Sequence, residues 1–351
     1  MAAATTEIDQ TTQPAVDAAA TSDTRRRRVF SGIQPSGATT LGNYLGAIKR
    51  WTEQQHTRQS IHCIVNLHAM SQTYQPAELR QRTLDLAAVL IACGIEPEKT
   101  ILFVQSEVPE HTELTWTLTS QTMFGELGRM TQFKDKGRGD ERSNAALFFY
   151  PVLMASDILL YDTDSVPVGD DQRQHVELTR DVATRFNATF GETFVIPVAD
   201  IEAEGARIMS LDDPTKKMSK SGAPGSYIAF QDTADEIRRK VMRAVTDSGS
   251  EIVASPDKPA LTNLLGIFSL MSGESVADIE ARFTGRGYGD FKREMADAVI
   301  AHMEPIQQRL TELSADPGEL RLILDRGTER ARAIATPMMQ RVREATGVTL
   351  G

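Results

Sequence analysis

Cysteine is scarce in this sequence of 351 residues, where only Cys63 and Cys93 occur. They form no C-x-x-C pair and have no histidine nearby at the spacing of a zinc site, so neither a disulfide framework nor a zinc centre is indicated. We expect both residues to be buried apolar side chains. No secretory hydrophobic segment is seen at the N-terminus, and we therefore expect the reducing environment of the cytoplasm.

The sequence also lacks any apolar run close to the roughly 18 residues that a membrane-spanning helix needs. A membrane protein is therefore not expected. Basic residues are outnumbered, and the formal net charge is −10. Because phosphate contacts depend on Lys and Arg, any RNA partner would have to bind a local basic patch on this acidic protein.

Hydrophobic periodicity is missing from the first part of the chain, and residues 1–28 are predicted to be a disordered tail. Acidic residues such as Glu7 and Asp9 argue against a mitochondrial transit peptide. The run of arginines at 25–28 is either an RNA contact or an ordinary solvated flank.

From Val29 onward, short apolar runs alternate with helical periods, which predicts an α/β fold with a Rossmann-like parallel sheet. The predicted strands are 29–33, 61–67, 101–105 and 194–198. A helix is predicted from Pro76 to Ala92, with Gly94 as its stop signal. After Gly225 long helical patterns dominate, at 234–245, 261–271 and about 317–342. We therefore expect an α/β domain with a helical insertion at 29–225 and a helical domain at 226–351.

A Gly- and Ser-rich segment, residues 31–37, runs from the end of the first predicted strand into a turn. A helix begins shortly after it. Free backbone N–H groups at such a helix start favour an anion such as a triphosphate. The glycines alone could equally mark a plain tight turn. Neither a Walker loop nor G-x-G-x-x-G is present, so an ordinary ATPase or a dehydrogenase is not indicated.

A second Gly- and Pro-bounded loop, residues 213–222, carries Lys217 and Lys220 on either side of a small residue. Two ammonium groups on a flexible loop can close on a polyphosphate leaving group as its negative charge develops. This pattern favours nucleotidyl or phosphoryl transfer.

These two segments together carry a family resemblance. Residues 217–221 read Lys-Met-Ser-Lys-Ser, the complete KMSKS signature of class I aminoacyl-tRNA synthetases, and Thr40-Leu41-Gly42-Asn43 stands in the place of that class's HIGH signature. Thr and Asn replace the usual histidines, which is typical of the tryptophan branch. With further matching stretches at 106–109, 125–127, 130–134, 154–161, 166–187 and 207–221, the sequence resembles the tryptophanyl-tRNA synthetases from Val29 to about Thr346.

The resemblance implies two sets of binding residues, and Lys217, Lys220 and Lys136 as catalytic cations. ATP would be held by Gln34, Pro35, Ser36, Gly42, Asn43, Gly169, Asp170, Asp171, Ile208, Lys217, Met218, Ser219, Lys220 and Ser221. Tryptophan would be held by Phe30, His68, Tyr150, Met154, Asp157 and Gln172, with Gln172 near its α-amino group.

Asp157 is also notable without the resemblance, because it is a carboxylate in an almost wholly apolar segment, where an unpaired charge would be costly. It could cap a helix or pair with an arginine. The resemblance implies instead that it accepts the indole N–H of tryptophan. Phenylalanine would then leave the carboxylate unsatisfied, and sites of this kind reject such analogues by about 10⁴ to 10⁵.

The segment after Gly169 predicts the start of a helix. Asp171 is a plausible N-cap with Gln174 at the third position, a capping-box arrangement. His175 lies within the same helix, and we expect it to be a packed residue rather than a catalytic one.

The resemblance finally implies an enzyme that joins L-tryptophan to tRNA(Trp) through an adenylate, with ATP as substrate, Mg²⁺ held mainly by its phosphates and no metal site or permanent cofactor. The helical domain would read the anticodon, and the family works as a homodimer. Candidate phosphate contacts are Arg238, Arg239, Lys240, Arg243, Lys292 and Arg293, which could equally be solubilising. The alternatives are a tyrosyl-tRNA synthetase and a synthetase-like sensor without catalysis.

Overall fold

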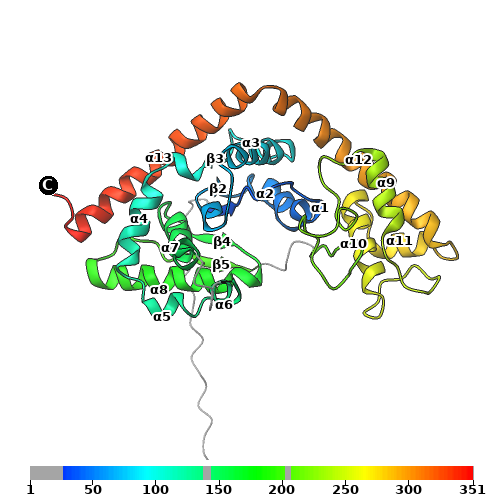
Figure 1. The fold of residues 1–351 in the computed structure, drawn as a ribbon, viewed down its shortest axis with the longest axis horizontal. Coiled ribbons are helices and arrows are strands. Elements are labelled where there is room, and N and C mark those ends of the chain that lie inside the picture. Colours follow the sequence, from blue (N-terminus) through cyan, green and yellow to red (C-terminus); the bar gives the residue numbers. More distant parts are fainter. Residues whose placement is uncertain (1–26, 137–143, 202–206, 351) are drawn as a thin grey trace, which may run out of the picture.

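The computed structural model describes residues 27–136, 144–201 and 207–350. Five strands form one fully parallel sheet in the order β3-β2-β1-β4-β5 (Figure 1). The strands are β1 (Arg28–Ile33), β2 (Gln59–Ile64), β3 (Ile101–Val104), β4 (Ser165–Pro167) and β5 (Val198–Asp200). The predicted α/β class is confirmed.

Helices, with loops between them, connect the strands and follow the last one. After β1 come α1 (Leu41–Asn43), a π-helical turn (Tyr44–Ile48) and α2 (Lys49–Gln54), followed beyond β2 by α3 (Pro76–Ala92). Between β3 and β5 lie α4 (Glu110–Thr119), α5 (Phe124–Leu127), α6 (Thr131–Lys136), α7 (Ala145–Leu159) and α8 (Arg173–Phe190). The last five are α9 (Ala234–Arg243), α10 (Pro259–Ser272), α11 (Val276–Arg282), α12 (Tyr288–Ala315) and α13 (Pro317–Thr346).

Successive side chains of a strand point to opposite faces of the sheet, and the core is accordingly divided into two clusters, one on each face. Phe30, Ile61 and Cys63 pack with α4, α7 and α8. Ile64 and Leu102 belong to the other cluster, which includes α1, α2, α3 and residues of the C-terminal helices. Cys63 and Cys93 are free and buried, as predicted.

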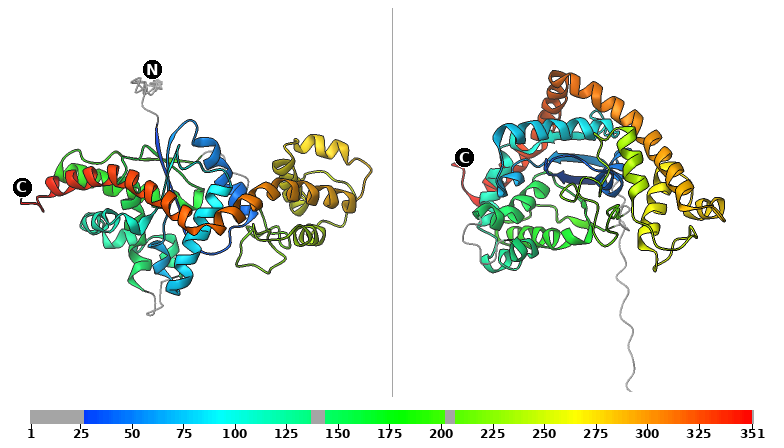
Figure 2. Two further views of the ribbon diagram at one scale, coloured as in Figure 1. Left: turned by 90° about the horizontal axis from the view of Figure 1, so that it is seen from above. Right: turned by 45° about the vertical axis from the view of Figure 1, so that its right-hand side comes forward.

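The last two helices form a long arc over the molecule (Figure 1). One arm, α12, packs on α9, α10 and α3. The helices α9, α10 and α11 stand to one side of the sheet (Figure 2). The other arm, α13, returns to the sheet and lies along the edge strand β3, contacting α3 and α4 as well. The division at residue 225 stays a prediction, but α13 packs on the α/β part of the chain.

Most predicted elements match the observed ones. The helix Pro76–Ala92 has the predicted bounds, and Gly94 just beyond it has φ +107°, a left-handed conformation that glycine adopts readily. Arg28, placed in the predicted tail, is instead the first residue of β1, and its side chain donates to the Tyr161 carbonyl at 2.6 Å. The rest of that tail lies outside the described residues, apart from Arg27.

The predicted strand 194–198 is wrong except for its last residue. Phe194 is buried against Phe186, and its backbone N–H and carbonyl both bond to the side-chain amide of Asn187. Those groups are therefore unavailable to a strand ladder. Pro197 has no N–H to donate, and β5 begins only at Val198.

His62 on β2 is 2% exposed, and neither ring nitrogen has a hydrogen-bond partner in the part of the chain that the structure describes. Its ring stacks on Trp51 at 5.2 Å. Burial lowers the pKa of His62 from 6.5 to about 4. The unfolded chain therefore binds the proton more tightly, and stability falls as the pH drops from about 6.5 towards 4.

We expect wild type to lose about 2 kcal/mol of unfolding free energy through His62 between pH 7.5 and pH 5, in urea titrations. His62→Leu should remove that part of the pH dependence. His56→Gln, at an exposed histidine paired with Glu96, is the control and should keep it. An unchanged pH dependence in His62→Leu would contradict the assignment.

No helix of the described chain is long and apolar enough to cross a membrane.

Candidate active site

A cavity of about 470 Å³ opens beside the carboxyl ends of β1, β2 and β4. This is where ligands bind in open parallel sheets. All six residues predicted to hold tryptophan line this one cavity: Phe30, His68, Tyr150, Met154, Asp157 and Gln172. Gln34 and Gly169 from the predicted ATP set line it too. The structure thus brings together residues from β1, α7 and three turns.

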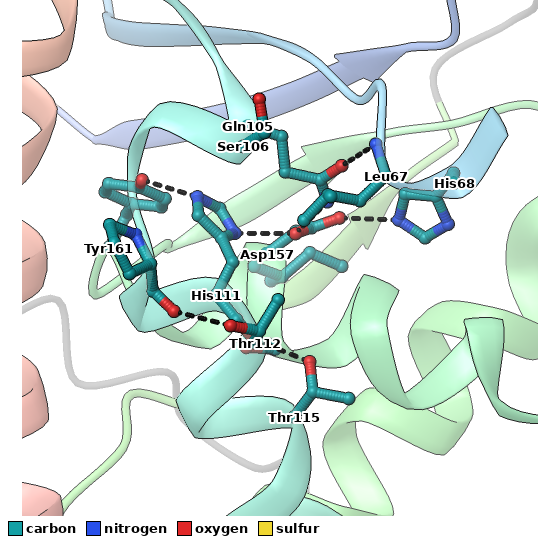
Figure 3. Close-up of polar contacts among 12 residues, drawn as sticks. Leu67, His68, Gln105, Ser106, His111, Thr112, Thr115, Asp157 and Tyr161 are labelled. Atoms are coloured by element: carbon teal, nitrogen blue, oxygen red, sulfur yellow. Dashed lines mark hydrogen bonds and ion pairs between the residues drawn. The ribbon is translucent and has the colours of Figure 1, made fainter. Parts of the chain in front are cut away.

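Asp157, in α7, is 1% exposed and is held by three side chains (Figure 3). One oxygen, Oδ1, accepts from Gln105 Nε2 at 2.6 Å and His111 Nδ1 at 2.7 Å, and Oδ2 accepts from His68 Nε2 at 2.8 Å. Neither a helix cap nor an arginine pair is found for it among these contacts, so both of those alternatives were wrong. Burial alone would raise the pKa of Asp157, but hydrogen bonds from His111 and His68 hold it below the usual value.

His175 is a packed residue, as expected. It is 1% exposed, and its Nε2 is hydrogen-bonded to the hydroxyl of Tyr150. Burial lowers the pKa of His175 to about 4 and raises that of Tyr150. The neutral ring therefore supports one wall of the cavity.

The predicted capping box at Asp171 is wrong. Residues Asp170–Gln172 form a 3₁₀ turn, and α8 begins only at Arg173, with no side-chain cap. Asp171 Oδ2 instead accepts from Gln172 Nε2 at 3.0 Å, and the carboxylate of Asp170 pairs with Arg173 at 2.9 Å. Gln174 accepts from Thr131 on the neighbouring segment.

The two signature segments lie in contact. Gly37 has φ +115°, and a Cβ placed there would lie 2.3 Å from Lys220 Nζ, so only glycine fits this turn without displacing the lysine. A Cβ on Gly42 would similarly meet Met218 Cβ at 3.1 Å. Lys220 therefore reaches the glycine-rich turn after β1.

Thr40 and Asn43, which replace the histidines of the first signature, cap the N-terminus of α1. The side chain of Thr40 accepts from the Asn43 backbone, and the Asn43 side chain accepts from the Thr40 backbone, a complete capping box. Pro35 is buried in the preceding turn and Ser36 is exposed, with its N–H donating to the Gln34 carbonyl at 2.8 Å.

The signature loop is attached at its base to two neighbours. Met218 N–H donates to the Ile208 carbonyl, and Met209 forms a β-bridge with Lys217. The side chain of Asn263 on α10 both accepts from Met209 N at 2.8 Å and donates to its carbonyl at 3.1 Å. Sequence reasoning missed this tether, since Asn263 lies in a helix far along the chain.

The cations of the site differ in their surroundings. Lys217 is exposed, as are Ser219 and Ser221, whose hydroxyls lie 2.9 Å apart. Partial burial and the nearby charge of Arg82 lower the pKa of Lys220. Lys136 ends α6, but its side chain lies outside the described part of the chain.

The parallel sheet, the cavity at its carboxyl edge and the lysine loop closing on a glycine-rich turn define a nucleotide-dependent activating enzyme. The family model of the class I tRNA synthetases for tryptophan and tyrosine matches residues 22–304. The chain belongs to this family.

The relatives of the chain show whether it belongs to the tryptophan branch or the tyrosine branch of this family. The chain is 51% identical to the tryptophan–tRNA ligase of Wolinella succinogenes over 92% of this chain and 99% of the relative, and 51% identical to that of Bacillus anthracis over 92% and 98%. The solved tryptophanyl-tRNA synthetase of Mycoplasma pneumoniae superposes with a TM-score of 0.83 at 36% identity, covering 92% and 98%. That of Campylobacter jejuni, solved with ADP and tryptophan, has a TM-score of 0.80 at 37% identity, covering 91% and 99%. Within the family, the chain belongs with the tryptophan enzymes.

Proposed function

We propose that this chain activates L-tryptophan with ATP, releasing pyrophosphate, and transfers the tryptophanyl group to the 3' end of tRNA(Trp). The observation that carries the proposal is the cavity, where six residues predicted for tryptophan meet beside a glycine-rich turn that contacts Lys220. Relatives about half identical over nearly their whole length are tryptophan–tRNA ligases.

The substrate supplies its own nucleophile in the first step. The tryptophan carboxylate attacks the α-phosphorus of ATP, the bond to the β-phosphate oxygen breaks, and pyrophosphate leaves with that bond's electrons. No general base is required, so positioning and electrostatics provide the acceleration. Lys220 and Lys217 stabilise the departing pyrophosphate, with Lys136 as a third cation. Mg²⁺ enters with the phosphates of ATP as part of the substrate.

Tryptophan-dependent ATP–pyrophosphate exchange tests the activation step. Purified protein is assayed with each of the twenty amino acids separately and without tRNA, and we expect exchange with tryptophan alone. Exchange with tyrosine would move the assignment to the sister enzyme. A folded protein that binds tryptophan but exchanges with no amino acid would be a sensor.

The RNA contact is proposed for the helical region from 226 onward. Most of the candidate cations there are already paired: Arg238 with Asp297, Arg239 with Glu236, Lys240 with Asp232 and Arg293 with Asp290. Lys292 is 9% exposed and donates to the Ala244 carbonyl just beyond α9, so its proposed phosphate contact is wrong. RNA binding by the paired cations would have to compete with these carboxylates.

Assembly as a homodimer in the cytoplasm completes the proposal. Four large apolar side chains are exposed on elements that pack together: Trp116 at 80%, Met123 at 55%, Phe124 at 80% and Phe149 at 39%. Exposed apolar residues grouped in this way are typical of interaction surfaces. We assign this group, on α4, α7 and the start of α5, to the contact with a second copy.

Trp116→Glu combined with Phe124→Glu should convert the dimer to a monomer in light scattering, with the dissociation constant raised at least about 100-fold. Leu322→Glu, at a 60% exposed residue on α13, should leave the dimer unchanged. A double variant that stays dimeric at micromolar concentration would refute this surface.

A further inference from the structure

We infer that Tyr161, His111 and Gln105 are positioning residues that fix Asp157 as a rigid, ionised acceptor with one open position, which selects a substrate carrying an N–H. This rests on the proposed function and deepens it. None of the three lines the cavity. Figure 3 shows His111 and Tyr161 on the side of Asp157 opposite His68, which does line it.

The acceptor capacity of Asp157 is nearly filled by the protein. A carboxylate accepts about four hydrogen bonds, two at each oxygen. Gln105 and His111 occupy Oδ1, whereas His68 is the donor to Oδ2. One direction at Oδ2 is left, and Asp157 lines the cavity. An indole N–H from the cavity would complete the set.

The orientation of Gln105 is set by a second bond. Its Oε1 accepts from the backbone N–H of Leu67 at 3.0 Å, so the amide nitrogen must be the atom that faces Asp157. Gln105 is 0% exposed. Rotation of the amide would lose both bonds in a buried place, where unpaired polar groups are costly.

The tautomer of His111 is set in the same way. An ionised Asp157 can only accept, so His111 Nδ1 carries the proton that it donates. The tautomer with its proton on Nδ1 has an acceptor at Nε2, and the hydroxyl of Tyr161 lies 2.8 Å away, within reach to donate to it. Burial raises the pKa of Tyr161, which keeps that hydroxyl protonated.

Packing holds the hydrogen-bonded side chains of Asp157, His111 and Tyr161 in place. The rings of His111 and Tyr161 are 0% exposed. His111 stacks on Phe103 at 5.8 Å, and Tyr161 stacks on Phe30, itself a wall of the cavity, at 5.7 Å. Ser156 Oγ donates to the His111 carbonyl at 2.8 Å, which ties α7 to α4 beside Asp157. The acceptor therefore cannot turn to suit a substrate that lacks a donor.

The test compares two substrates in full-length protein: L-tryptophan and its benzothiophene analogue, in which sulfur replaces the indole N–H. For Tyr161→Phe we expect kcat/KM in pyrophosphate exchange to fall about 10-fold with tryptophan, mainly through KM, and to stay within about twofold with the analogue. His111→Leu should shrink the discrimination further. His111→Asn, which keeps an N–H near the position of Nδ1, should restore most of it.

An equal loss for both substrates would show a merely structural role, and unchanged discrimination in Tyr161→Phe and His111→Leu would show no role; either result overturns the inference. Circular dichroism and urea titration identify variants that do not fold, and Tyr161→Phe, the smallest change, is then decisive. Wild-type protein that does not use tryptophan would refute the proposed function itself, which is a different result from altered discrimination in the variants.

Discussion

Replacing Lys220 by alanine is expected to slow tryptophan-dependent ATP–pyrophosphate exchange by about 100- to 1,000-fold. The Lys220 ammonium lies against Gly37 in the turn after β1, where a nucleotide phosphate would meet the start of the helix. Partial burial and the charge of Arg82 lower the pKa of Lys220, which means that its protonated form is destabilised by these surroundings. A bound phosphate would stabilise that charge. Its loss should therefore lower kcat more than it raises KM for tryptophan.

Lys216→Ala is the matched control, in the same loop. Its ammonium is paired with Asp213 at 2.8 Å and its side chain is 76% exposed, so we expect exchange within about twofold of wild type. Calorimetric titration of tryptophan should give equal affinities for both variants. An exchange rate in Lys220→Ala close to that of Lys216→Ala would remove Lys220 from the reaction.

The strands could be predicted from the sequence where a short apolar run is also a buried strand of the parallel sheet. The strands from Val29, Ile61 and Ile101 are buried apolar runs in a parallel sheet, and their bounds were found to within a few residues. The fifth strand was not, because the apolar residue Phe194 is buried by the side chains of α8 while Asn187 takes its backbone groups. An apolar run alone does not show which partner satisfies its backbone.

Part of the candidate site could be predicted from stretches of sequence that resemble the family. Residues such as His68 and Asp157 were indicated by resemblance, and the cavity brings them together. Asn263 and Gln105 carried no signal, because their roles depend on contacts with residues far away in the sequence. His111 is a lone histidine in a helix, a pattern that usually means packing, and only its distance to Asp157 shows otherwise.

The helix α13 depends on one glycine for its contact with the sheet. A Cβ on Gly327 would lie 1.8 Å from the carbonyl oxygen and 2.7 Å from the carbonyl carbon of Leu102, both backbone atoms of β3. No side chain can move aside there, so α13 would have to withdraw from the strand. We expect Gly327→Ala to lower the free energy of unfolding by at least about 3 kcal/mol in urea titrations.

A loss of stability in Gly327→Ala would have to come from packing, because helix propensity alone predicts a gain. Alanine in place of a helical glycine normally stabilises by up to about 1 kcal/mol. Gly266 in α10 is the control, because a Cβ there meets nothing within 4 Å, and Gly266→Ala should be neutral or stabilising. If Gly327→Ala behaved in the same way, α13 would not be held against β3, and the Arg330 bonds to the Thr100 and Pro97 carbonyls would have to hold the helix without close backbone contact.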